Sequence, residues 1–139
     1  MIVVDTNVIS EPLRQSPEAR VVAWIDAQPL ETLYLSAITV AELRFGVASL
    51  PAEKRRTRMD DSLETEILPL FAGRILAFDP AGSLAYAKLM MVARTAGLAI
   101  APADGYIAAT AAANGMTVAT RDTAPFEAAG VPVINPWTA

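Results

Sequence analysis

Segments typical of strands and of helices alternate along the whole chain, and this alternation is the strongest constraint on the fold. We expect strands at residues 2–4, 33–35, 74–79, 116–120 and 131–134. The longest helix-like segments between them are residues 36–49, 52–68, 80–96 and 102–114. Strands that alternate with helices form parallel sheets with helices packed on both faces. The sequence therefore predicts an α/β fold of three layers, α/β/α, around a mostly parallel central sheet.

The composition predicts one domain that spans residues 1–139 and is large enough to bury a real core. Apolar residues make up 53% of the chain, yet no apolar run approaches the roughly 20 residues that a membrane span needs. The chain starts directly in a predicted strand, without the features of a signal peptide. We therefore expect a cytoplasmic protein that does not interact with a membrane.

The chain contains neither cysteine nor histidine. The absence of cysteine excludes a disulfide framework, a thiolate metal site and a cysteine nucleophile. The absence of histidine excludes the commonest general base and the usual Ser-His relay. A catalyst built from this sequence must work with carboxylates, hydroxyls, Lys or Arg, and hard cations are the natural cofactors of carboxylates.

Two acidic residues follow predicted strands. Asp5 comes directly after the β-branched run at 2–4 and precedes Thr6 and Asn7, and Asp122 follows Thr120 at the end of the fourth strand. Ligands of open α/β sheets bind beyond the carboxyl ends of the strands, so both acids are candidates for chemistry. The structural alternative for Asp5 is a cap at the start of the next helix.

Two further acids lie on predicted helices. Glu42 lies beside an expected apolar stripe of Ile38, Ala41 and Phe45, where an unpaired charge is costly. Asp104 lies in the first turn of the helix that starts near Pro102, where the macrodipole stabilises an anion. Each has a plain structural alternative, a glutamate that reaches solvent and a helix-stabilising aspartate. Asp79 precedes Pro80 at a helix start and is assigned to capping.

The four acids would raise one another's pKa if they met in one cleft. Mg²⁺ or Mn²⁺ would supply the missing positive charge, because these cations bind oxygen ligands octahedrally and keep several waters. Such a cation can activate one water for attack on a phosphodiester.

The charge balance gives a conflicting signal. A net charge of −4 argues against an unassisted nucleic-acid binder. Lys54, Arg55, Arg56 and Arg58 nevertheless form a local basic cluster that either meets phosphates or is a solvated helix face. A separate apolar stripe of Leu84, Ala87 and Met91 exceeds what one small core needs and predicts a homodimer.

Five motifs resemble those of PIN-domain ribonucleases, the VapC-type toxins of toxin–antitoxin pairs, and they occur in the family's order. They are VDTNVIS at 4–10, TVAELRFG at 39–46, DGYIAATA at 104–111, VATRD at 118–122 and VINPW at 133–137. The resemblance covers essentially the whole chain, and the closing motifs look closest to the FitB-like subgroup.

The resemblance implies that Asp5, Glu42, Asp104 and Asp122 form an acidic site for Mg²⁺ or Mn²⁺. Thr6, Asn7 and Thr120 would be polar supports around it. Many relatives have Asn at the position of Asp122 and an acid three residues later, where this chain has Pro125. Here the fourth acid is therefore Asp122 itself.

The resemblance also implies an endoribonuclease toxin that hydrolyses RNA by means of a metal-activated water. It would form a homodimer and pair with an antitoxin whose DNA-binding part supplies the basic surface. An antitoxin segment would occupy the toxin's groove, often with an Arg against the acids. Two alternatives stay open: a small-molecule phosphohydrolase with Asp5 as nucleophile, and a non-catalytic partner of a DNA-binding antitoxin in a transcriptional regulator. The phosphohydrolase lacks a second Asp two residues after Asp5 and a lysine near the site.

Overall fold

The computed structural model describes all 139 residues and contains one sheet of five parallel strands in the order β3-β2-β1-β4-β5. The strands are β1 Ile2–Val4, β2 Leu33–Ser36, β3 Ile75–Leu76, β4 Thr117–Ala119 and β5 Val133–Ile134. β1 lies at the centre, with Val3 level with Tyr34 of β2 on one side and with Val118 of β4 on the other. The parallel sheet and the position of every predicted strand are confirmed, although β3 is shorter than residues 74–79.

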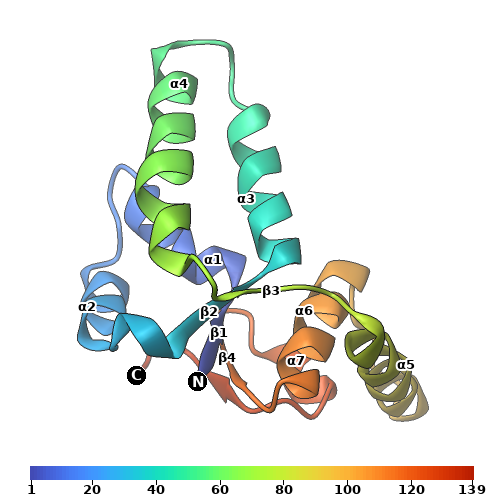
Figure 1. The fold of residues 1–139 in the computed structure, drawn as a ribbon. Coiled ribbons are helices and arrows are strands. Elements are labelled where there is room, and N and C mark those ends of the chain that lie inside the picture. The colour runs from blue at the N-terminus through green and yellow to red at the C-terminus, as the bar shows by residue number, and fades with distance from the viewer.

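Seven α-helices surround the sheet (Figure 1). They are α1 Thr6–Ile9, α2 Ala19–Ala27, α3 Ala37–Ala48, α4 Lys54–Asp61, α5 Pro80–Thr95, α6 Pro102–Ala113 and α7 Ala124–Ala128. Short 3₁₀ turns occupy Glu11–Leu13 and Leu30–Thr32. None of the helices is long and apolar enough to cross a membrane.

The core consists of two hydrophobic clusters, one on each face of the sheet. One contains Val4 of β1 together with buried residues of α1, α2 and α3, and the other contains Val3 together with residues of α5, α6 and α7. Successive side chains of a strand point to opposite faces, so β1 is buried on both sides, as its β-branched run predicts. The predicted α/β/α layering is therefore confirmed.

Helix α3 buries a different face from the predicted one. Val40, Leu43 and Val47 pack into the core, whereas Ala41 is exposed and Phe45 is 64% exposed. The expected stripe of Ile38, Ala41 and Phe45 was wrong because both sets of residues have helical spacing. The buried set is the one that faces the sheet. The helix begins after Ser36, whose side chain accepts a hydrogen bond from the Ile38 amide.

The charged helix predicted at residues 52–68 is divided in the structure. Helix α4 begins at Lys54, continues as a π-helix over Ser62–Ile67 and closes as a 3₁₀ turn over Leu68–Phe71. Pro69 therefore lies inside the closing turn and does not end the helix at Leu68. Helices α3 and α4 form a hairpin that projects from the body of the molecule, above the carboxyl end of β1 (Figure 1).

Candidate functional site

The four candidate acids come from four separate parts of the chain. Asp5 directly follows β1, and Asp122 follows the neighbouring strand β4. Glu42 lies in the middle of α3, and Asp104 lies in the first turn of α6. Because β1 and β4 are parallel neighbours, Asp5 and Asp122 lie at the same edge of the sheet.

Asp5 is the buried member, with a relative exposure of 4%. Its Oδ1 accepts a hydrogen bond from the Thr6 amide at 2.8 Å, so it does cap α1. Its Oδ2 accepts from the Thr120 hydroxyl at 2.8 Å and from the Asn7 side-chain amide at 3.4 Å. Both oxygens are thus held, which fixes the carboxylate at the carboxyl end of β1.

Asn7 and Thr120 connect Asp5 to the segment that carries Asp122. The Asn7 Oδ1 accepts from the Arg121 amide at 3.1 Å, and the Thr120 Oγ1 accepts from the Asp122 amide at 3.1 Å. Thr120 is fully buried. The structure therefore brings two of the three predicted supporting residues, Asn7 and Thr120, into contact with Asp5 and with the backbone around Asp122.

Glu42 joins this arrangement through Thr6. The Thr6 hydroxyl donates to Glu42 Oε1 at 2.7 Å, which ties α1 to α3. Glu42 is exposed, as the exposed face of α3 requires. Thr6 thus binds Asp5 through its backbone and Glu42 through its side chain.

The acids lie close enough to perturb one another. Burial raises the pKa of Asp5 from 3.8 to about 6, against the lowering effect of its bonds from Thr120 and Thr6, and the charges of Asp104 and Glu42 raise it further. Burial also raises the pKa of Asp104, with added repulsion from Asp122 and Glu42. The four carboxyl groups therefore share one region of unfavourable negative charge.

The donor chemistry of this region fits a hard divalent cation, since every available ligand atom is an oxygen and the charge is negative. No three acidic side chains lie close enough together, as placed, to hold one metal ion. A cation here would therefore be held by one or two carboxylates directly and by the others through water, as is common for Mg²⁺. On the buried side of the same helix as Glu42, Thr39 has a fully buried hydroxyl that makes no hydrogen bond.

A groove of about 320 Å³ starts at Thr6 and Glu42 and runs between α3 and α4. Its apolar lining includes Leu43 and Val47 of α3 and Met59 of α4. Two arginines, Arg14 and Arg55, also line it. The groove thus combines an apolar floor with cations and leads directly to one of the acids.

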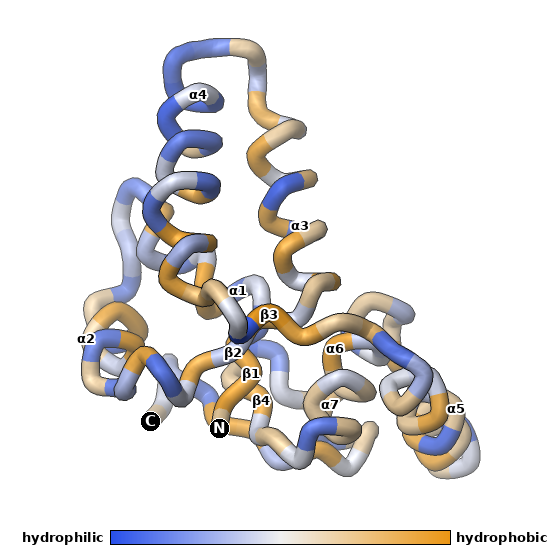
Figure 2. The backbone as a smooth tube through the Cα atoms, viewed as in Figure 1, coloured by the Kyte–Doolittle hydropathy of each residue, from blue (hydrophilic) through white to orange (hydrophobic).

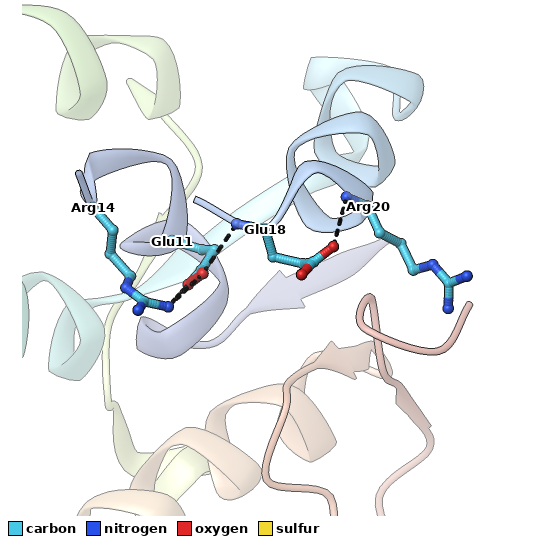
Figure 3. Close-up of polar contacts among 4 residues, drawn as sticks. All are labelled: Glu11, Arg14, Glu18 and Arg20. Atoms are coloured by element: carbon cyan, nitrogen blue, oxygen red, sulfur yellow. Dashed lines mark hydrogen bonds and ion pairs between the residues drawn. The ribbon is translucent and has the colours of Figure 1, made fainter. Parts of the chain in front are cut away.

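Arg14 is held in place by a residue that the sequence analysis did not single out. Glu11 is 3% exposed and accepts two hydrogen bonds from Arg14 Nη1, at 2.7 and 3.1 Å (Figure 3). It also accepts from the Glu18 amide at 3.3 Å, and Glu18 in turn caps α2 through the Arg20 amide. The i,i+3 spacing of Glu11 and Arg14 was the available sequence signal.

Comparison with known proteins gives a consistent result over the full length. The PIN domain family pattern matches residues 2–131. The VapC ribonuclease Y4jK of Sinorhizobium fredii is 64% identical over 137 residues, which cover 99% of this chain and 98% of that protein. The toxin FitB of Neisseria gonorrhoeae is 60% identical over 137 residues, 99% of each chain. In a solved structure of FitAB bound to an IR36 DNA fragment, the matching chain is 59% identical, with a TM-score of 0.96 over 99% of this chain and 96% of that one.

Proposed function

Because this chain belongs to the PIN-domain family, we propose that it is the toxin of a toxin–antitoxin pair and that it acts as an endoribonuclease. The observation that carries the proposal is full-length identity of 60% or more to a protein named a ribonuclease and to one named a toxin. The acidic region at the carboxyl end of β1 supplies a matching chemistry. RNA phosphodiester bonds are the substrate class that we assign to it.

We assign the acidic site to Asp5, Glu42, Asp104 and Asp122, which together would hold Mg²⁺ or Mn²⁺. When bound, the cation neutralises the mutual repulsion of the carboxylates and supplies Lewis-acid activation of the attacking water. Asp5 is the most firmly held of the four, because Thr6, Asn7 and Thr120 fix both of its oxygens. Thr6 orients Glu42 toward the same region through its hydroxyl.

The test is RNA cleavage by purified, antitoxin-free protein, with and without Mn²⁺, in two matched variants. Asp104→Asn removes a proposed metal ligand from the first turn of α6. Asp79→Asn makes the same chemical change at the start of α5, where Asp79 Oδ1 only caps the helix by accepting from the Gly82 amide at 2.9 Å. We expect cleavage to fall by orders of magnitude in Asp104→Asn and to persist in Asp79→Asn. Equal activity of the two variants would contradict the assignment.

We also propose that the groove between α3 and α4 receives a segment of an antitoxin. The apolar lining suits apolar side chains, and Arg55, which has no partner in the fold, suits a carboxylate on the same segment. The similar FitAB structure is a complex bound to DNA, which supports a DNA-binding partner for this chain. That partner would supply the basic surface that a chain of net charge −4 lacks.

Gly46 offers a direct test of the groove, because it lines the groove on α3 and a Cβ added there meets no atom within 4 Å. Gly46→Leu should fill the groove and weaken antitoxin binding without harming the fold, since Leu favours helix. Gly46→Ala is the matched control and should bind antitoxin nearly as wild type does. Unchanged binding by Gly46→Leu would place the antitoxin elsewhere.

The homodimer stays a proposal, and its surface is the outer face of α5. Leu84, Met91 and Val92 are each more than half exposed on that helix. A contiguous apolar face of this kind is typical of protein interfaces. Sedimentation at micromolar concentration should give a dimer, and a monomer would contradict this proposal.

We further propose that residues 1–139 act as one domain in the cytoplasm, where the RNA substrate is found.

A further inference from the structure

The cations of this protein fall into two groups, those with a partner in the fold and those without one. Five of the eleven Lys and Arg side chains are engaged. Arg14 and Arg44 pair with acids, Arg20 and Arg74 donate to backbone carbonyls, and Arg121 lies over the Trp137 ring. Six cations make no hydrogen bond or ion pair, namely Lys54, Arg55, Arg56, Arg58, Lys88 and Arg94.

Four of these six form the α4 basic cluster, Lys54, Arg55, Arg56 and Arg58, all on α4. All four are exposed. They lie at the end of the projecting hairpin, and Figure 2 shows α4 as hydrophilic there, whereas the facing helix α3 is largely apolar. The cluster is therefore the one concentration of free positive charge on a chain of net charge −4.

Three of the four cations, Lys54, Arg55 and Arg56, lie in the first turn of α4 and do not stabilise that helix, whereas Arg58 lies in its last turn. The amino end of a helix carries partial positive charge, so cations in the first turn are unfavourable there by a few tenths of a kcal/mol each. No acid lies within that turn, and the N-cap residue Glu53 makes no side-chain hydrogen bond to it. Four exposed cations that make no hydrogen bond or ion pair in the fold, three of them against the helix dipole, are suited to binding an external anion.

The positions of the four side chains connect the cluster to the acids. Arg55 lines the groove that also contains Thr6 and Glu42. Lys54, Arg56 and Arg58 line a shallow hollow at the tip of the hairpin. The positive charge is thus concentrated at the end of the hairpin, and the groove that Arg55 lines connects it to Thr6 and Glu42.

We propose that the α4 basic cluster binds the phosphate backbone of the RNA substrate and directs the strand past Arg55 to the acids. This inference rests on the proposed ribonuclease activity. Contacts to phosphates give affinity and register without reading sequence. The cluster therefore sets how tightly RNA is held, and the acids, which the cluster does not contact, set the chemistry.

The test compares two double variants that each replace one lysine and one arginine by glutamine. Lys54→Gln with Arg58→Gln removes two members of the α4 basic cluster, one helical turn apart. Lys88→Gln with Arg94→Gln removes the two free cations of α5 and is the matched control, and sedimentation verifies that both variants keep the oligomeric state of wild type. Glutamine has nearly the helix propensity of the residues that it replaces, so both variants should fold, as thermal melting will verify.

Affinity for an unstructured single-stranded RNA is measured by fluorescence anisotropy in EDTA, which prevents cleavage, at several salt concentrations. Each phosphate contact to single-stranded RNA contributes about 0.7 to the slope of log affinity against log salt. The α4 double variant loses two such contacts, so the slope should be shallower by about 1.4. The variant should also bind RNA about tenfold more weakly than wild type at low salt. The α5 variant should match wild type. With Mn²⁺, the α4 variant should show a raised KM for RNA and an unchanged kcat.

The outcomes separate the two proposals. If wild type cuts RNA and the α4 variant binds RNA as tightly as wild type, the ribonuclease stands and this inference is overturned. Equal weakening in the α4 and α5 variants would also overturn it, because the effect would then reflect net charge alone. If the α4 variant keeps its RNA affinity but loses antitoxin binding, the cluster belongs to the protein partner. Wild type that neither binds nor cuts RNA would overturn both proposals.

Discussion

The buried carboxylate of Asp5 should make the stability of the metal-free protein fall as pH rises. Its pKa is 3.8 without perturbation and about 6 in the folded chain. The folded state therefore binds more protons than the unfolded state between these values, so stability falls with pH in that range. The contribution is fully present below about pH 4 and is lost as pH rises through about 6. A shift of about two units corresponds to roughly 3 kcal/mol.

Asp5→Asn isolates this effect because asparagine does not titrate. Its carbonyl oxygen can still accept from the Thr6 amide, and its amide can donate to the Thr120 hydroxyl in place of the bond that Asp5 accepts. Denaturant unfolding in EDTA, at about pH 4 and about pH 7.5, gives the free energy of unfolding of both proteins. The free energy of unfolding of Asp5→Asn, relative to that of wild type, should be roughly 3 kcal/mol higher at about pH 7.5 than at about pH 4. A difference that stays constant with pH would refute the burial argument.

Three further substitutions distinguish a residue of the proposed metal site from residues with a purely structural role. Asp104→Asn should melt at or above the wild-type temperature in EDTA, because it removes repulsion from Asp122 and Glu42. Mn²⁺ should stabilise wild type by roughly 2.7 kcal/mol at a hundredfold excess over Kd and the variant much less, so an equal response would show that Asp104 does not bind metal. Asp79→Ala removes the cap on α5 and should cost about 1 kcal/mol in denaturant unfolding, with RNA cleavage retained. Thr39→Val removes a buried hydroxyl without a partner and should stabilise the fold by about 1 kcal/mol, and a loss of stability would show that this hydroxyl is in fact satisfied.

The fold was largely predictable because strand and helix signals alternate and several helices carry their own boundary signals. Asp79 caps α5 as predicted, and Ser36, the first residue of the predicted segment 36–49, caps α3. Gly97 follows α5 with a φ of 74°, a conformation that favours glycine at the end of a helix. These signals are local, so they can be identified without knowledge of the tertiary structure.

The features that the sequence did not predict depend on tertiary contacts. The buried face of α3 could not be chosen from spacing alone, since Phe45 and Val47 both belong to helical apolar patterns. The π-helix after α4 has no local signal of its own. The ion pair between the buried Glu11 and the exposed Arg14 falls in a polar segment between two predicted elements.

The site was predicted as a set of acids, but their separate environments were not. Sequence position alone does not show that Asp5 is buried and held at both oxygens, whereas Glu42 is exposed. The hydrogen bond from Thr6 to Glu42 joins residues 36 positions apart, and that of Thr120 to Asp5 joins residues 115 apart. Such contacts follow from the order of strands in the sheet, which local patterns do not fix.

The chemistry of the RNA ends tests the central claim most directly. Antitoxin-free protein is incubated with RNA and Mn²⁺, and the new ends are mapped. Attack by water at an acidic metal site leaves a 5′-phosphate and a 3′-hydroxyl, and we expect these ends to disappear in EDTA and in Asp104→Asn. Ends that carry a 2′,3′-cyclic phosphate would show that the 2′-hydroxyl of the RNA was the nucleophile and would contradict the account.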